Sequence, residues 1–239
     1  MSNRRHQRRV VLLSFSGIDG AGKSTQITSL RAQLQDAGFR VRLLAFWDDI
    51  AMLRHSREVM SYTAFKGERG VGAPDRPVNR QDKNVKAWYL TAARWFLYFL
   101  DAVSLSIKVA SVTPATADVI ICDRYTYDEL ANLALDHALV RGYARALLKF
   151  VPKPDIAFLI DADPVQARER KPEYPLEFLQ VNRATYLEIA RMAGMTVVGP
   201  LPVRETTDAV TQLTLGVLRQ DDPEFPQLQA TADSSMRPE

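Results

Sequence analysis

One eight-residue segment constrains the fold of this chain more than any other: residues 17–24, which read GIDGAGKS and fit the pattern G-x-x-x-x-G-K-[ST]. Glycines at these spacings let backbone N–H groups curl around phosphate oxygens, in conformations that other residues avoid. The lysine supplies a positive charge for the outer phosphates, and the hydroxyl after it can bind Mg²⁺. The segment therefore predicts a nucleotide-phosphate site formed by Gly17, Asp19, Gly20, Ala21, Gly22, Lys23, Ser24 and Thr25, with Ser24 as a metal ligand.

The flanking sequence favours this interpretation over a plain turn. An apolar run at 10–15 precedes the segment, and apolar side chains three or four residues apart follow it as far as Gly38. The first pattern indicates a strand and the second indicates a helix that ends at the glycine. A strand, a phosphate loop and a helix, in that order, are what the motif requires.

The rest of the chain alternates in the same way. Short apolar runs at 39–46, 118–123, 154–163 and 195–200 predict four more strands. Helices are expected at 48–60, 87–111, 127–150, 164–170, 175–194 and around 209–217. Strands separated by helices indicate an α/β fold whose five-stranded parallel sheet is flanked by helices. Ligands bind at the carboxyl ends of the strands in such sheets, so the functional residues should follow the strands directly.

Length and composition indicate one domain over 10–219, between a basic tail at 1–9 and a polar tail at 220–239, both expected to be disordered. Four arginines lie in the first nine residues, so the net charge of +3 becomes +3 − 4 = −1 without them. We therefore expect no basic face for nucleic acid. A single cysteine, Cys122, allows no internal disulfide and fits a reducing cytoplasm. Charges interrupt the apolar helix at 87–110, so we expect no membrane span.

A charged pair, Asp123 and Arg124, follows the apolar run at 118–122. Asp123 could hold Mg²⁺ at the strand end, or it could cap the next helix. The neighbouring arginine favours the first role, because phosphoryl transfer needs cations around the equatorial oxygens. Two further aspartates, Asp161 and Asp163, follow the fourth predicted strand, and there a helix cap ahead of a proline is the favoured interpretation.

A second cationic cluster, Arg168, Arg170 and Lys171, follows these aspartates. It could be an exposed helix face or a mobile lid that closes over ATP, and Pro172 and Pro175 are typical of a loop at this point. The residues alone leave both interpretations open.

The segments GIDGAGKST and DRYTYD together resemble the thymidylate kinase family, and more broadly the nucleoside monophosphate kinases. LIDADPVQARER, LEFLQVNRATYLEIA and TAARWFLYFLD resemble that family's fourth strand and lid, its following helix and its substrate-side helix, and the similarity extends from about residue 10 to 218. The resemblance implies a three-layer P-loop NTPase fold, ATP as donor, Mg²⁺, a nucleotide acceptor such as dTMP, and a homodimer.

The resemblance also assigns roles to residues. On the donor side these are Lys23 and Ser24 for ATP and metal, Asp123 and Arg124 around the transferring phosphoryl group, and Arg168 or Arg170 as the lid's catalytic arginine. The lid must supply this arginine because residues 18–21 contain none. On the acceptor side, Asp19 would lie near the sugar and phosphate, Arg94 would bind the phosphate, and Tyr125 would pack by the sugar.

Two features depart from the family pattern on the acceptor side. The chain has FWDDI at 46–50 where the family commonly carries Arg-Glu-Pro, and Phe96 is the nearest match to a polar residue, often Gln, that usually faces the pyrimidine. The lid is also abbreviated. Trp47 and Phe65 could stack on a ring, or they could belong to the core.

Two alternative functions remain open from the sequence. The acceptor could be a nucleoside or another small molecule with a hydroxyl group, for which Asp48 or Asp49 would be the candidate base. The chain could also be a nucleotide-binding protein with little turnover whose tails or long loop contact a partner.

Overall fold

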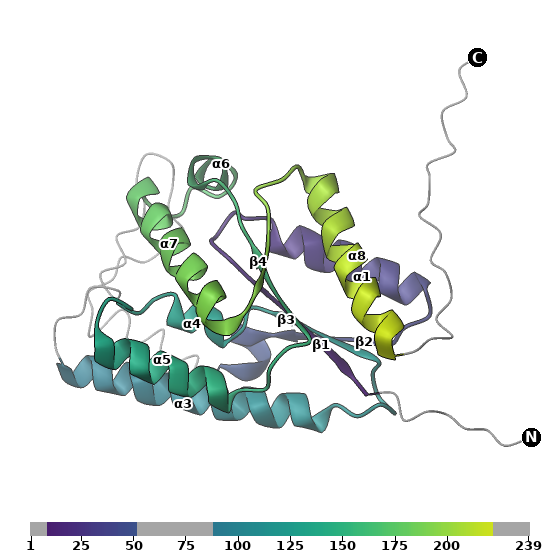
Figure 1. Cartoon of the computed structure of the whole chain (residues 1–239), viewed down its shortest axis with the longest axis horizontal. Helices are drawn as coiled ribbons and strands as arrows, with labels where there is room; N and C mark the ends of the chain where they lie inside the picture. The colour runs from purple at the N-terminus through teal and green to yellow at the C-terminus, as the bar shows by residue number, and fades with distance from the viewer. Residues whose placement is uncertain (1–8, 52–87, 222–239) are drawn as a thin grey trace, which may run out of the picture.

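The computed structural model describes residues 9–51 and 88–221. Five parallel strands form one sheet in the order β2-β3-β1-β4-β5, with helices on both faces (Figure 1). The strands are β1 (Val11–Ser16), β2 (Val41–Ala45), β3 (Val119–Asp123), β4 (Ile156–Ile160) and β5 (Thr196–Val198). This arrangement confirms the three-layer α/β fold expected from the alternating apolar runs.

The central strands are buried because helices cover both sides of the sheet. All six positions of β1 and all five of β4 are buried, which is why both read as continuous apolar runs rather than alternating ones. In the register of the sheet, Ala45 and Phe15 lie on either side of Asp123. The carboxyl ends of β1, β2 and β3 therefore meet at one edge.

The helices divide into two groups. Their bounds are α1 (Lys23–Asp36), α3 (Trp88–Ser111), α4 (Thr126–Leu130), α5 (Ala138–Phe150), α6 (Pro164–Arg170), α7 (Leu176–Ala193) and α8 (Val203–Asp221), with a π-helical turn η1 (Phe46–Ile50) after β2. α1 and α8 pack together on one side of the sheet, and α3, α4, α5 and α7 lie on the other (Figure 1). α7 ends at Gly194, whose φ of +67° is the left-handed cap expected there.

The single helix expected over 127–150 is wrong. The structure has α4 and α5 there, separated by residues 131–137. The side-chain amide of Asn132 donates to the carbonyl oxygen of Asp128 at 2.9 Å, a local bond that competes with the helical backbone. Leu133 and Leu135 are buried in this connection. Their burial explains why an apolar periodicity continues through a segment that is not helical.

Two other expectations fall at the limits of what is described. The helix expected at 48–60 lies largely outside the described residues. At its start the structure has the π-helical turn η1, which ends at Ile50. Within 9–51 and 88–221, no helix combines the length and the apolar character needed to cross a membrane.

Cys122 lies buried in β3, and burial raises the pKa of its thiol to about 12.

Candidate active site

The segment between β1 and α1 is a glycine-dependent loop at the carboxyl edge of the sheet. Gly17 and Gly20 have φ values of +144° and +82°, a region that favours glycine. A Cβ on Gly17 would collide with the carbonyl oxygen of Ile160, and one on Gly20 would collide with that of Ala167. Gly22 caps α1 without a side chain, so the first-turn amides are available to an anion.

Lys23 lies beneath this loop. It is buried, and its Nζ donates to the carbonyl oxygens of Gly17 at 2.7 Å and Ile18 at 2.9 Å. Because an ammonium group has three N–H bonds, the third can meet a phosphate oxygen. Burial, helped by the nearby Arg124, lowers the pKa of Lys23 to about 8. Ser24 and Thr25 are exposed in the first turn of α1.

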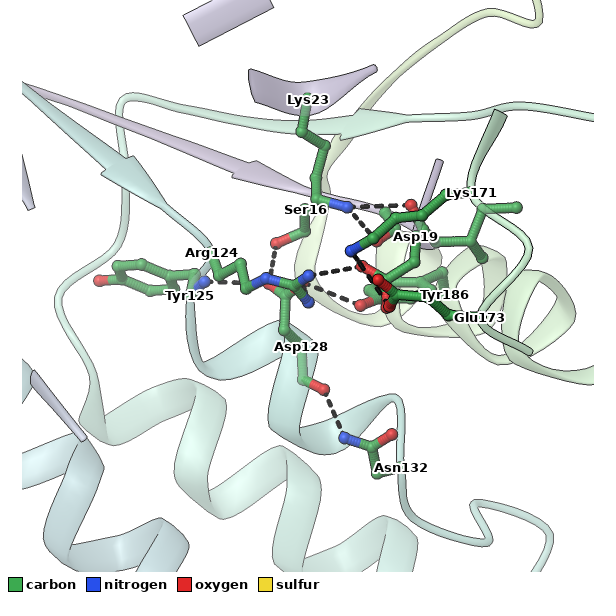
Figure 2. Close-up of polar contacts among 12 residues, drawn as sticks. Ser16, Asp19, Lys23, Arg124, Tyr125, Asp128, Asn132, Lys171, Glu173 and Tyr186 are labelled. Atoms are coloured by element: carbon green, nitrogen blue, oxygen red, sulfur yellow. Dashed lines mark hydrogen bonds and ion pairs between the residues drawn. The ribbon is translucent and has the colours of Figure 1, made fainter. Parts of the chain in front are cut away.

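Arg124 reaches the same loop from the end of β3 (Figure 2). Its Nη2 donates to Oδ1 of Asp19 at 2.6 Å, and its Nη1 lies 3.7 Å from Oδ1 of Asp128. Burial alone would lower the pKa of Arg124, but the two carboxylates outweigh it and raise that pKa. Burial likewise acts to raise the pKa of Asp19, yet Arg124, Lys23 and Lys171 outweigh it, so that pKa is lowered. Both groups are therefore held in their charged forms.

Asp128 is the buried carboxylate behind this arginine. Its Oδ2 accepts from Oγ of Ser16 at 2.6 Å and from the backbone N–H of Tyr125 at 2.9 Å, while its Oδ1 accepts from the hydroxyl of Tyr186 at 2.8 Å. These donors come from β1, the turn after β3, and α7 (Figure 2). Asp128 thus joins three elements of the fold next to Arg124.

The segment predicted as a lid forms α6, and one face of it lies on the phosphate loop. Gly20 packs against the backbone of Ala167, and Nη1 of Arg170 lies 3.9 Å from where a Cβ of Gly22 would be. Nζ of Lys171 is 3.9 Å from Oδ1 of Asp19. The Cα–Cβ bond of Arg168 lies about 200° from that of Arg170 around the helix axis, on a different side of α6. The structure therefore brings Arg170 to the loop, while Arg168 is half-buried on another side of α6 and its predicted role stays a prediction.

No protein-family model matches the chain, but several curated proteins are similar to it in sequence. A thymidylate kinase of Solidesulfovibrio magneticus is 27% identical over 232 residues, which cover 87% of this chain and 98% of that protein. A probable thymidylate kinase of Pyrococcus abyssi is 29% identical over 192 residues, covering 74% and 82%, and a thymidylate kinase of Ruegeria pomeroyi is 28% identical over 197 residues, covering 76% and 82%. The chain is a distant relative of the thymidylate kinase family. These likenesses span most of both chains and confirm the resemblance drawn from the motifs.

The donor set of this thymidylate kinase relative fits a magnesium ion bound together with phosphates. Ser24 is exposed at the start of α1, and Asp123 is half-buried at the end of β3. Burial raises the pKa of Asp123, against the opposing effect of Arg124 and Lys23. No three His, Cys, Asp or Glu side chains of the described segments gather as a metal site. Mg²⁺ suits such an open site, because it is usually held by one or two carboxylates, water and substrate phosphates.

The residues predicted for the acceptor are spread over several elements. Asp19 lies among the cations of the phosphate loop. Trp47 is 40% exposed on η1, edge-on to Phe46 with ring centroids 5.4 Å apart, and Arg94 is half-buried on α3. Phe65 lies outside the described residues. The roles of these residues toward an acceptor stay predictions.

The ring of Tyr125 points away from the phosphate loop (Figure 2). It is fully buried, and its hydroxyl donates to the carbonyl oxygen of Pro152 at 2.5 Å. Its backbone N–H, by contrast, donates to Asp128. Tyr125 thus contacts the site through its main chain, and its predicted role beside the acceptor sugar stays a prediction.

Sequence reasoning identified Asp163 correctly and missed the partner of Asp161. Oδ1 of Asp163 accepts from the first-turn amides of α6, which confirms the expected cap. Asp161 makes a two-bond ion pair with Arg183, with Nε–Oδ1 of 2.6 Å and Nη2–Oδ2 of 2.7 Å. Arg183 and Tyr186 lie one turn apart on α7; Arg183 holds Asp161, which follows β4, and Tyr186 holds Asp128 of α4. Their spacing in the LEFLQVNRATYLEIA segment was the signal that could have found them.

Proposed function

We propose that this protein transfers the γ-phosphoryl group of ATP to a nucleoside monophosphate, and that dTMP is its acceptor. The observation that carries the proposal is the convergence of Lys23, Arg124 and Arg170 on one glycine loop at the carboxyl edge of the sheet. The relatives named as thymidylate kinases support the reaction class and suggest the acceptor.

The chemistry follows from the placement of positive charge around the transferring phosphoryl group. The loop amides and the third N–H of Lys23 would bind the outer phosphates, and Arg124 and Arg170 would balance charge that develops on the transferring group. Ser24 and Asp123 would hold Mg²⁺, which supplies further neutralisation of the phosphates when bound. An acceptor phosphate oxygen forms the new bond to the γ-phosphorus as the bond to the β,γ-bridging oxygen breaks, and the electron pair leaves with ADP. The acceptor is already ionised, so no general base is needed.

One observation favours an acceptor hydroxyl as the second candidate. Asp48 is exposed on η1, close enough to Asp123 to act on its pKa, and so lies at the same edge of the sheet. Asp49 is less suited, because its Oδ2 accepts from the backbone N–H of Ala45 at 2.8 Å. Asp48 would be the base for such an acceptor.

A panel assay decides between these functions. Purified protein with ATP and Mg²⁺ is supplied with nucleoside monophosphates or with nucleosides, and ADP release is measured. We expect turnover with dTMP that Lys23→Ala abolishes. Turnover with nucleosides alone that Asp48→Asn abolishes would replace our proposal by the second candidate, and tight ATP binding without acceptor-dependent turnover would indicate a binding protein.

We further propose that two copies associate through α3. Phe96 and Ile107 are 60% and 63% exposed on this helix, and Phe99, also exposed, meets Phe150 with ring centroids 5.4 Å apart. An apolar stripe of this kind marks an interaction surface. Light scattering should report a dimer for the natural chain and a monomer for Phe96→Glu, whereas Val181→Glu, at an exposed apolar position of α7, should leave the dimer intact.

We also propose a single catalytic domain over 10–219 that acts in the cytoplasm. The described strands form one sheet on which the described helices pack. The buried Cys122 thiol, with its raised pKa, is suited to packing rather than to disulfide exchange.

A further inference from the structure

A cavity of about 320 Å³ lies apart from the phosphate loop. The C-terminal ends of α5 and α7, the segment that leads into β4, and Tyr127 of α4 form it. None of the residues that line it belongs to the phosphate loop, to α6 or to the Asp123-Arg124 pair. Its volume falls within the range of about 300–1,000 Å³ that small-molecule sites occupy.

Three cations line this cavity: Arg145 and Lys149 of α5, and Lys153 of the following segment. No acidic residue lines it, and none of the three makes an ion pair with the residues that the structure describes. Arg145 and Lys149 are four residues apart on one helix, where like charges repel. An anion in the cavity would relieve this repulsion and pair with all three cations.

A tyrosine hydroxyl at the wall of the cavity adds a directional donor. Tyr127 is only 3% exposed, it lines the cavity, and its hydroxyl has no hydrogen-bond partner in the described part of the chain. A phenol has an apolar ring that packs and a polar hydroxyl that can donate to a ligand in the cavity. Burial also raises the pKa of Tyr127, so the phenol keeps its proton and acts as a donor.

The remaining walls are apolar. They consist of Leu148, Val151, Pro152, Met192 and Ala193. Cations and a donor beside an apolar wall match a ligand that has one anionic group and one hydrophobic group. We propose that this cavity is a second binding site, for a small organic phosphate whose phosphate meets Arg145, Lys149, Lys153 and the Tyr127 hydroxyl, and whose apolar part lies against Leu148 and Met192.

Calorimetric titration of the full chain with phenyl phosphate tests the site. The triple variant Arg145→Gln, Lys149→Gln, Lys153→Gln should bind at least about tenfold more weakly, since three charge-assisted contacts are lost. Tyr127→Phe removes only the hydroxyl and should weaken binding by about five- to tenfold. The matched control Arg31→Gln, Arg42→Gln, Lys108→Gln removes the same charge from exposed positions and should bind as the natural chain does.

Three results would overturn the proposal. They are the absence of measurable binding, equal weakening in the cavity variant and the control, and inorganic phosphate binding as tightly as phenyl phosphate. Lys23→Ala keeps the cavity intact and should leave the affinity unchanged; loss of binding in this variant would place the ligand on the phosphate loop instead. Because binding is measured without turnover, failure of the kinase proposal would leave this result interpretable.

Discussion

Replacing Asp128 by asparagine should destabilise the fold and slow catalysis together. The carboxylate accepts three hydrogen bonds, from Ser16, Tyr125 and Tyr186, and lies 3.7 Å from Nη1 of Arg124. An asparagine can keep one oxygen toward Ser16 and Tyr125. Its NH₂ group then faces the hydroxyl of Tyr186, which can no longer donate to this position, and the guanidinium of Arg124, which can only donate.

The size of the effect follows from these contacts. A hydrogen bond to a charged group contributes about 1.5–3 kcal/mol, and the substitution removes one such bond and a nearby ion pair. We therefore expect a loss of about 2–4 kcal/mol in the free energy of unfolding, which is roughly 5–15 °C in Tm for a domain of this size. Arg124 keeps Asp19 but loses the carboxylate behind it, so we expect kcat to fall by about tenfold or more, because one misplaced contact in the transition state costs at least that much.

Thermal melts and steady-state kinetics on Asp128→Asn check both effects, with Asp208→Asn as the control. Asp208 is exposed on α8, and the control removes the same charge. Kinetics are measured well below the Tm of the weaker variant, so that unfolding does not contribute. A Tm within about 2 °C of the control, less than the shift that 1 kcal/mol produces, together with an unchanged kcat, would refute the reasoning that Asp128 positions Arg124.

The remaining predictions concern three other features. The unfolded chain binds more protons than the folded one between the folded pKa of Lys23, about 8, and its ordinary value of 10.5, so the stability of the free protein should rise with pH across this window. ATP favours the charged lysine, and calorimetry at pH 8 in buffers of different ionisation enthalpy should show an uptake of about half a proton that Lys23→Met lacks. Gly142→Ala in α5 meets no neighbouring atom and should add about 0.5–1 kcal/mol to the free energy of unfolding, whereas Gly20→Ala, whose Cβ collides with the backbone of α6, should lower the Tm in melts. Arg170→Ala should lower kcat about a hundredfold or more, and Arg168→Ala should leave it nearly unchanged; equal losses would show that helix geometry does not select between them.

The architecture was predictable because the sheet is buried on both faces. Each central strand is then a short run of apolar residues, and each such run predicted a strand of the structure. The one wrong helix, over 127–150, shows the limit of periodicity. Buried leucines such as Leu133 can follow a helical spacing in a turn, and only the bond from Asn132 to the backbone shows that the helix has ended.

Some residues of the site are close together in the sequence, and others meet only because distant segments fold against one another. The loop glycines and Lys23 are close together in the sequence, as are Asp123 and Arg124. Their residue types and spacing therefore predicted that they lie at the carboxyl edge of the sheet. The buried network was not predictable, because its contacts join residues far apart in sequence. Asp128 meets Ser16 across 112 positions and Tyr186 across 58.

Arg124 shows how the two kinds of information combine. Its φ of +71° is a left-handed conformation that costs a non-glycine residue about 1–2 kcal/mol. The backbone N–H of Arg124 donates to the carbonyl oxygen of Phe15 at 3.0 Å, and the turn aims its guanidinium at Asp19 and Asp128. These partners offset the strain. Of the three, only Asp128 belongs to the DRYTYD segment, whereas Phe15 and Asp19 come from the N-terminal part of the chain. A strained conformation held by buried partners is typical of functional positions. The local sequence thus supplied the arginine, and the distant residues that fold against it determine where its charge lies.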